Sequence, residues 1–307
     1  MDIKKVAIIG AGAVGCYMLW GLFQKENIEI SVIAAGGRKE RFEKDGFYIN
    51  DRIYRPVIKT PVEASGVDLL IVSVKYNALK SALPDIKKIV GEKTIVMSLM
   101  NGVDSEEIIA SEIGEERVLP ALIKVASERR ENRVCFDAET TVGVVYGERD
   151  GKKSERTMAI AELFGGTGLH FRETDVILPE IWSKYRLNVG NNQPQAMLGV
   201  GVGAYSDSEH VEAIREGLIN ELEKIAKAKG IDISKADASS FKGSKVSKKA
   251  RYSTLQDLDA KRHTEVEMFS GAIVRMGKEL GIPTPYNEFT YHMIKALEEK
   301  NDGMFDY

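Results

Sequence analysis

Apolar and polar positions change their spacing about halfway along the chain. The first half contains apolar runs of strand length at residues 5–10, 28–34, 67–74 and 93–99. Stretches of helical character lie between some of these runs, at residues 15–26 and 81–91. Strands that alternate with helices predict βαβ units and a parallel sheet.

Three further apolar runs follow, at residues 117–128, 133–137 and 140–148. No clear helical pattern separates them. We therefore expect them to form added strands, antiparallel to their neighbours, at the end of the same sheet.

From about residue 176 the apolar residues recur at helical spacing almost throughout. The stretch 210–231 follows three cap residues, Ser206, Asp207 and Ser208. The stretch 264–282 ends at Gly281, and "GIPTPYNE" after it predicts a helix stop and a new start. The Ser- and Lys-rich residues 239–253 predict a mobile loop.

These patterns predict an α/β protein with two domains. Residues 1–175 form an N-terminal Rossmann-type domain with a parallel sheet, and residues 176–307 form a C-terminal all-α domain. A chain of 307 residues with 43% hydrophobic content is long enough for two such cores.

Composition excludes several classes of protein. A formal net charge of −3 argues against a nucleic-acid partner. No apolar stretch approaches the roughly 20 residues of a membrane span. Two cysteines, Cys16 and Cys135, form no disulfide framework, and the four histidines lack metal-ligand spacing. We expect a soluble, cytoplasmic protein that binds no metal and no membrane.

The first motif indicates a dinucleotide cofactor. "GAGAVG" fits the pattern G-x-G-x-x-G, and it follows a predicted strand and opens a predicted helix, as the motif requires. The glycines allow a tight turn and close approach to a pyrophosphate, and the helix N-terminus attracts its charge. We therefore predict that Gly10, Gly12, Ala13, Val14 and Gly15 bind the cofactor. The alternative is a structural turn without a ligand.

The end of the second predicted strand favours NADP over NAD. An NAD enzyme usually places a carboxylate there to bond the ribose 2′-hydroxyl. This chain has Ala34 and Ala35, followed by Arg38 and Lys39, which could pair with a 2′-phosphate. Arg38 is the first candidate. The alternative is that "RKERFEK" simply starts a solvated helix.

A second motif supplies candidate chemistry. Lys184, Asn188 and Asn192 recur every four residues in "IWSKYRLNVGNN", and four helical residues turn through about 400°, so all three point the same way. A lysine can donate a proton to a ketone oxygen while it is reduced, and asparagines can bond the substrate without adding charge. The alternative is a polar helix face turned to water.

At these residues the chain resembles the ketopantoate reductase family, NADPH enzymes of pantothenate and coenzyme A synthesis. The similar segments are "VAIIGAGAVG", "VSVK", "SLMNG", "IWSKYRLNVGNN" and residues 253–288. The resemblance implies NADPH-dependent reduction of 2-dehydropantoate to (R)-pantoate, and a helical domain similar to that of 6-phosphogluconate dehydrogenase.

The resemblance also implies catalytic roles for two residues. Lys184 would be the general acid that protonates the ketone oxygen, and Glu265 would bond the substrate's hydroxyl and help to orient the lysine. From the sequence alone, Glu265 opens a helix after Thr264, and a helix-dipole role suffices to explain it.

Binding roles follow in the same way from the resemblance. Asn188 and Asn192 would hold the polar groups of the substrate, and Ser253 would bind its carboxylate. Asn101 would lie near both nicotinamide and substrate, with Lys75 close to the cofactor ribose. By its residue type alone, Ser253 would be an ordinary cap or loop residue.

Departures from the family pattern leave two alternatives. Many members carry an arginine where this chain has Ala35, which weakens the preference for NADP. Asn191 and Gln193, beside the substrate-facing stripe, favour a paralogous NAD(P)-dependent dehydrogenase of another branched 2-keto or hydroxy acid. The second alternative is a non-catalytic NADP-binding regulator. A homodimer through the helical domain is also expected.

Overall fold

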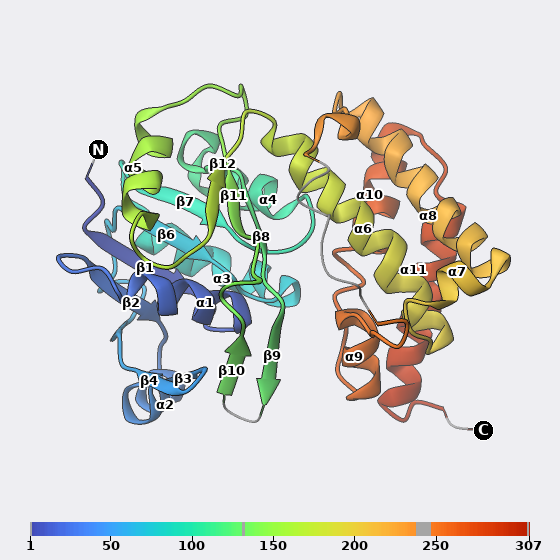
Figure 1. Cartoon of the computed structure of the whole chain (residues 1–307), viewed down its shortest axis with the longest axis horizontal. Coiled ribbons are helices and arrows are strands. Elements are labelled where there is room, and N and C mark those ends of the chain that lie inside the picture. The colour runs from blue at the N-terminus through green and yellow to red at the C-terminus, as the bar shows by residue number, and fades with distance from the viewer. Residues whose placement is uncertain (1, 131–132, 238–246, 306) are drawn as a thin grey trace. The chain divides into compact units, whose positions relative to one another are not determined.

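The computed structural model describes residues 2–130, 133–237, 247–305 and 307 (Figure 1). The chain forms two compact units. The first, Met1–Asn101 with Ser105–Ile177, carries the strands and is called the sheet unit. The second, Gly102–Asp104 with Leu178–Tyr307, is called the helical unit. The fold class is α/β with an N-terminal parallel sheet and a helical C-terminal part, as predicted.

The central sheet has the strand order β5-β2-β1-β6-β7, with every neighbouring pair parallel (Figure 1). Its strands are β1 (Lys5–Ile9), β2 (Glu29–Ile33), β5 (Val57–Lys59), β6 (Leu69–Val72) and β7 (Ile95–Ser98). The four apolar runs of the first hundred residues correspond to β1, β2, β6 and β7, which confirms the parallel sheet. The short strand β5 was not foreseen.

Both faces of this sheet are buried because other elements cover each of them, and alternate residues of a strand point to opposite faces. On β1, Val6 and Ile8 join a core that includes Met18 of α1 (Ala13–Leu22). Ala7 and Ile9 join a second core with residues of α3 (Tyr76–Ile89) and α4 (Ser105–Ile113). The continuous apolar runs in the sequence follow from this two-sided burial.

The later strands do not extend the central sheet as expected. They form a sheet of order β4-β3-β10-β9 and another of order β12-β11-β8. Antiparallel pairing is confirmed for β9 with β10 and for β8 with β11, but β10 pairs β3 and β11 pairs β12 in parallel. The strands are β3 (Phe47–Ile49), β4 (Arg52–Tyr54), β8 (Ala121–Lys124), β9 (Ser127–Arg130), β10 (Arg133–Phe136), β11 (Gly143–Tyr146) and β12 (Phe171–Glu173).

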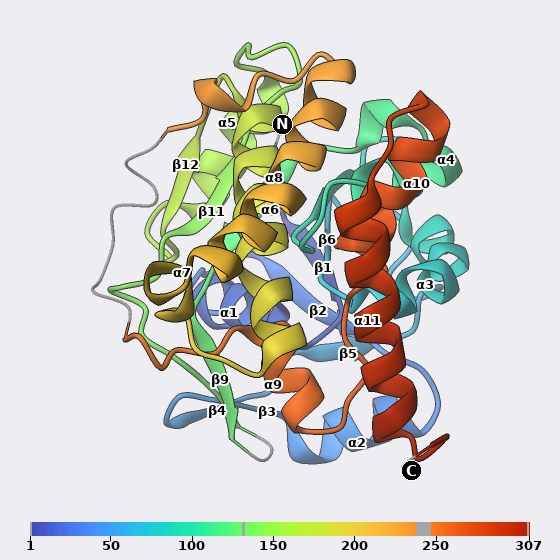
Figure 2. The same ribbon diagram turned by 90° about the vertical axis from the view of Figure 1, so that its right-hand side faces the viewer.

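Helices α2 (Gly37–Asp45) and α5 (Glu155–Phe164) and a 3₁₀ turn, η1 (Glu115–Arg117), complete the sheet unit. In the helical unit α8, α10 and α11 pack against one another (Figure 2). Its elements are α6 (Ile177–Leu198), α7 (Ala204–Asp207), α8 (Glu209–Ala228), η2 (Ile233–Lys235), α9 (Ser253–Asp259), α10 (Ser270–Leu280) and α11 (Pro285–Asn301).

Helix ends in this unit follow the predicted signals. Ser208 caps α8, and its hydroxyl accepts a hydrogen bond from the Val211 N–H at 3.4 Å. Gly281 ends α10 in the left-handed conformation, with φ of 68°, which glycine adopts without a Cβ penalty. Pro285 then starts α11 at a position where its missing N–H costs nothing. The predicted stop and restart is confirmed.

The predicted loop at 239–253 lies partly outside the described residues. Its described part, residues 247–252, has no regular structure, and Ser253 already belongs to α9.

A short segment from the first half of the chain belongs to the helical unit. Gly102–Asp104 follows β7 in sequence but groups with residues 178–307. The Asp104 carboxylate pairs with the Arg275 guanidinium at 3.2 Å, and Arg275 also donates to the Glu267 carbonyl at 3.1 Å. Gly102 has φ of 89° and lies so close to Met268 that an added Cβ would come within 2.6 Å of its Cγ.

Candidate functional site

Each glycine of "GAGAVG" has a different reason to be glycine. Gly10 has φ of 98°, and an added Cβ would lie 2.5 Å from the backbone of Ser73 and Val74. At Gly15 an added Cβ would lie 2.1 Å from the Gly10 carbonyl oxygen, so the helix passes close to the turn. At Gly12 an added Cβ would meet no protein atom within 4 Å. Packing within the sheet unit therefore requires glycine at Gly10 and Gly15 and places no such requirement on Gly12.

The residues between these glycines present backbone rather than side chain to such a ligand. Ala13 and Val14 open α1 and pack against the apolar core of the sheet unit. The first N–H groups of a helix have no partner within that helix and carry a partial positive charge. Such an arrangement is suited to the pyrophosphate of a dinucleotide, and the cofactor role of these residues stays a prediction.

Three candidate residues follow strands whose carboxyl ends lie at one edge of the parallel sheet. Gly10 follows β1, Lys75 follows β6, and Asn101 follows β7. The register pairs Ile9 with Val72 and Val72 with Ser98, so the carboxyl ends of these strands are level. Strand order reverses here, since β2 lies on one side of β1 and β6 on the other. Ligands of doubly wound sheets bind at such a switch point.

The turn itself is fastened to β6 by a residue that the sequence did not single out. The Ser73 hydroxyl donates to the Gly10 carbonyl at 2.7 Å. No local pattern reveals this role, because the bond joins positions 63 residues apart.

The end of β2 carries no carboxylate. Ala34 is buried, Ala35 is exposed, and α2 begins two residues later. Arg38 is exposed in its first turn and has no ion pair among the described residues. Lys39 contacts protein instead: its ammonium lies 3.2 Å from Glu63 and donates to the Ile58 carbonyl at 2.7 Å. Arg38 is therefore the better candidate for a 2′-phosphate, although "RKERFEK" does also start a helix.

Lys184, Asn188 and Asn192 all lie on α6, as predicted. Lys184 and Asn188 are half-buried, and Asn192 is 7% exposed. A face that was simply turned to water would not bury an asparagine to this degree. The three side chains share one side of the helix because of their four-residue spacing.

Asn191 and Gln193 face other helices and not this stripe. The Asn191 side-chain oxygen accepts from the Arg215 guanidinium of α8 at 2.9 Å. Gln193 is fully buried, and its amide donates to the Ser270 hydroxyl of α10 at 2.5 Å. These hydrogen bonds pack the helical unit, and the expectation that the two residues favour another keto or hydroxy acid stays a prediction.

Glu265 does not open a helix, contrary to the prediction. It lies in a turn, residues 264–269, and α10 begins only at Ser270. Its carbonyl oxygen accepts from the N–H groups of Met268 at 3.0 Å and Phe269 at 3.2 Å. A helix-dipole role therefore does not explain the carboxylate, which is half-buried.

A tyrosine that sequence analysis missed joins α6 to this turn. Tyr185, directly after Lys184, is 1% exposed. Its hydroxyl lies 3.0 Å from the Met268 carbonyl oxygen and 2.6 Å from that of Phe269. The residue beside Lys184 is thus bonded to the turn that carries Glu265. Both candidate catalytic residues belong to one hydrogen-bonded frame within the helical unit.

Ser253 is the first residue of α9 and is exposed. Its neighbour Thr254 is buried, so the side chain of Ser253 and not that of Thr254 is open to a ligand.

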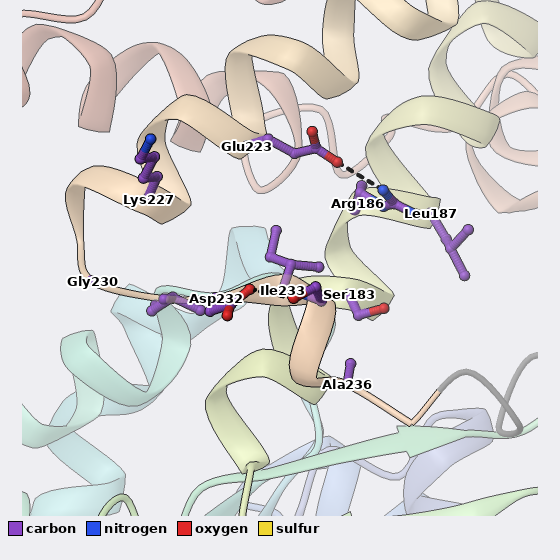
Figure 3. A pocket seen from close by; sticks show the side chains of 11 residues that line it. Ser183, Arg186, Leu187, Glu223, Lys227, Gly230, Asp232, Ile233 and Ala236 are labelled. Carbon is purple, nitrogen blue, oxygen red and sulfur yellow. Dashed lines mark hydrogen bonds and ion pairs between the residues drawn. The ribbon is translucent and has the colours of Figure 1, made fainter.

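A pocket of about 830 Å³ lies on another face of α6 (Figure 3). Ser183, Arg186 and Leu187 line it, and the Arg186 guanidinium pairs with Glu223 of α8 at 2.7 Å. Ser183 and Leu187 lie about 60–100° around the helix from Lys184. Lys184 and the two asparagines do not line this pocket. It is therefore not the candidate catalytic site.

Two kinds of feature are absent from the described part of the chain. Within it, no helix has both the length and the apolar content needed to cross a bilayer. The same residues bring together no cluster of three or more His, Cys, Asp or Glu side chains that could hold a metal ion.

Two family models match the two parts of the chain. The model described as ketopantoate reductase PanE/ApbA matches residues 6–150, and its C-terminal counterpart matches residues 176–298. The chain belongs to the ketopantoate reductase family. It is thereby a member of a family of oxidoreductases, as the sequence resemblance indicated.

Individual relatives of the ketopantoate reductase family are distant but cover nearly the whole chain. A 2-dehydropantoate 2-reductase of Streptococcus pyogenes is 25% identical over 95% of this chain and 97% of its own. A family structure from Ralstonia eutropha has 26% identity and a TM-score of 0.82, covering 97% of this chain and all of the other. A D-mandelate dehydrogenase solved with NADH and anilino(oxo)acetate has 23% identity and a TM-score of 0.81 over 97% of this chain and 99% of its own.

Proposed function

We propose that this protein is an NADPH-dependent 2-dehydropantoate 2-reductase that forms (R)-pantoate, a step in pantothenate and coenzyme A synthesis. Residues 1–175 would bind the cofactor and residues 176–307 the substrate. The observation that carries the proposal is the frame of the helical unit, in which Tyr185 bonds the helix of Lys184 to the turn of Glu265. Family membership and the turn at Gly10–Gly15 support the cofactor class.

Proton transfer is the part of the reaction assigned to this chain. A bound nicotinamide supplies the hydride for the ketone carbon. The Lys184 ammonium donates a proton to the oxygen as negative charge develops there, and solvent then reprotonates the amine. Asn188 and Asn192 bond the neighbouring polar groups of the substrate and add no charge that would compete with the lysine. Glu265 bonds the substrate hydroxyl.

The remaining candidate residues have binding roles in this proposal. Ser253, exposed at the start of α9, binds the substrate carboxylate. Asn101 lies near nicotinamide and substrate, and Lys75 lies near the ribose. Arg38 pairs with the 2′-phosphate. The homodimer through the helical unit stays a prediction.

Replacing Lys184 tests the proposed chemistry. Lys184→Ala should lower kcat with 2-dehydropantoate by roughly 10²–10⁴-fold, the usual contribution of a general acid. The Kd of NADPH should stay within about twofold, because the cofactor turn lies in the sheet unit. NADPH oxidation in the steady state and fluorescence titration measure the two quantities.

The same measurement separates the competing functions. A non-catalytic regulator would bind NADPH and show no turnover to lose. A panel of 2-keto acids should show the highest kcat/KM for 2-dehydropantoate, and equal rates with pyruvate would refute that substrate.

A second candidate is an NAD(P)-dependent dehydrogenase of another branched 2-keto or hydroxy acid. The absence of an arginine at position 35 and the overall similarity to D-mandelate dehydrogenase favour it. It predicts comparable kcat/KM values with NADH and NADPH and a preference for an aromatic or bulkier keto acid within the panel.

A further inference from the structure

The turn that carries Glu265 is fastened to α11 by a buried carboxylate. Glu298 is 2% exposed, and one of its oxygens accepts both the Thr264 N–H and the Thr264 hydroxyl at 2.7 Å. Thr264 is itself 2% exposed. Two hydrogen bonds from one residue to one charged oxygen fix the position of that residue more firmly than a single bond to a neutral acceptor would.

The peptide groups on the other side of Glu265 are fixed as well. The Thr264 hydroxyl oxygen accepts from the Val266 N–H at 3.2 Å. The Val266 side chain is 1% exposed and packs with Leu258 and Ile294. The carbonyl of Glu265 is also bonded within the turn, so the backbone on both sides of this residue is held in place.

Charged groups around Glu298 keep it in the acceptor form. The Lys295 ammonium lies 2.9 Å from its second oxygen, and the Nδ1 atom of His263 lies 3.7 Å from the same oxygen. Nε2 of His263 is 2.8 Å from Asp302. Burial raises the pKa of Glu298, but the hydrogen bonds from Lys295 and Thr264 outweigh it and hold that pKa below its ordinary value. The carboxylate is thus ionised at neutral pH.

We propose that Glu298 is a positioning residue of the reductase, which acts through Thr264 to aim Glu265 at the substrate. The inference rests on the proposed function, in which Glu265 bonds the substrate hydroxyl. Without the charged acceptor, the Thr264 N–H and hydroxyl lose their common partner and the turn can relax. The Glu265 carboxylate then spends less time in the productive direction, although its chemistry is unchanged.

A double-mutant cycle tests this coupling. Glu298→Gln keeps the shape of the side chain but removes its charge and one acceptor oxygen. It should lower kcat with 2-dehydropantoate by roughly tenfold and leave the KM of NADPH within about twofold. In a Glu265→Ala background the same change should have no further effect on kcat, because the residue that it aims is gone.

Glu221→Gln is the matched control. Glu221 is 4% exposed and accepts the N–H groups of Tyr286 at 2.8 Å and Asn287 at 2.9 Å, so it also fastens backbone in the helical unit. Its effect on kcat, whatever its size, should be the same with and without Glu265. If Glu298→Gln also lowers kcat by the same factor with and without Glu265, the positioning role is overturned.

Thr264 offers a second variant should Glu298→Gln fold poorly. Thr264→Val keeps the N–H bond and the shape but removes the hydroxyl, and its effect should also vanish in the Glu265→Ala background. Thr264→Ser, which retains the hydroxyl, should keep most of the activity. If Glu265→Ala alone leaves kcat unchanged, the proposed function loses its role for Glu265 and this inference falls with it. If the effects of Glu298→Gln and Glu265→Ala on the activation free energy are additive, only the positioning role of Glu298 is overturned, and the proposed function stands.

Discussion

At the scale of single residues, a side chain would have different surroundings at each of the three glycines of the turn Gly10–Gly15. An added Cβ at Gly15 would overlap the Gly10 carbonyl, whereas one at Gly12 would meet no protein atom. The protein itself therefore has room for a side chain at Gly12. In the proposed function, the bound cofactor would occupy that room. In the proposed function, the fold of the turn requires glycine at Gly10 and Gly15, and the approach of the cofactor requires it at Gly12.

Two substitutions separate these demands. Gly15→Ala should destabilise the protein by about 1–3 kcal/mol, since the helix must shift away from the turn. Gly12→Ala should cost only about 0.5 kcal/mol at a helix N-cap, and yet weaken NADPH binding by at least about tenfold. Thermal unfolding and fluorescence titration check both. A Gly12→Ala protein with unchanged NADPH affinity would contradict the proposed close approach of the pyrophosphate.

At the scale of elements, Tyr185 couples α6 to the turn at 264–269. Its buried hydroxyl contacts two carbonyl oxygens, so Tyr185→Phe leaves both without that partner and should cost about 1–3 kcal/mol. The positions of Lys184 and Glu265 relative to each other would then be less fixed. At 25 °C kcat should therefore fall by more than the small unfolded fraction of the variant explains. Steady-state kinetics at a temperature well below the unfolding midpoint measure this.

Tyr205→Phe serves as the comparison for that experiment. The Tyr205 hydroxyl donates to the Asn191 carbonyl at 2.5 Å and so also joins α6 to a neighbouring helix, α7. It has no contact with the turn of Glu265 among the described hydrogen bonds. Its loss should lower the unfolding temperature and leave kcat nearly unchanged. Equal losses of kcat in the two variants would refute a special role for Tyr185.

A second coupling between elements is sensitive to pH. Glu148, after β11, accepts two hydrogen bonds from Arg156 of α5, at 2.6 and 2.5 Å, and one from the α5 N-cap, Ser154. The Arg156 hydrogen bonds, with help from Ser154, hold the pKa of Glu148 below its ordinary value of 4.5, against burial and the nearby Asp150.

The sign of the effect on stability follows from that direction. A carboxyl whose pKa is lower in the folded state stabilises the protein above its unfolded pKa, and this contribution disappears as the pH falls through the folded pKa. The unfolding temperature should therefore drop below about pH 4.5, and drop less steeply in Glu148→Gln. Thermal melts between pH 3 and 7 of the two proteins test this; identical slopes would contradict it.

At the scale of the whole molecule, sequence reasoning succeeded where the signal is local. The two-sided burial of the central strands gives continuous apolar runs, and Ser208, Gly281 and Pro285 mark helix ends by their own conformational preferences. It failed where partners are distant in sequence. The strands after residue 120 pair with β3 and β12, a choice that no local pattern encodes.

In the candidate site, too, the sequence predicts local features and not contacts between residues far apart in the chain. Spacing placed Lys184, Asn188 and Asn192 on one side of a helix, but it could not show which helix faces Gln193, one residue further on. Helical periodicity also extended α10 back to residue 264, because the hydrogen bonds of Thr264 to Glu298, 34 residues away, are invisible to it. The roles of Tyr185, Ser73 and Glu298 all depend on such long-range contacts.

The segment Gly102–Asp104 has a practical consequence for anyone who would study the helical unit alone. A gene fragment that starts at codon 178 omits three residues which the folded unit includes, and with them the carboxylate that pairs with Arg275. Met268 would also lose the backbone of Gly102 that it packs against. A fragment that reproduces the helical unit would therefore have to include this tripeptide, because the unit consists of two separate stretches of the chain.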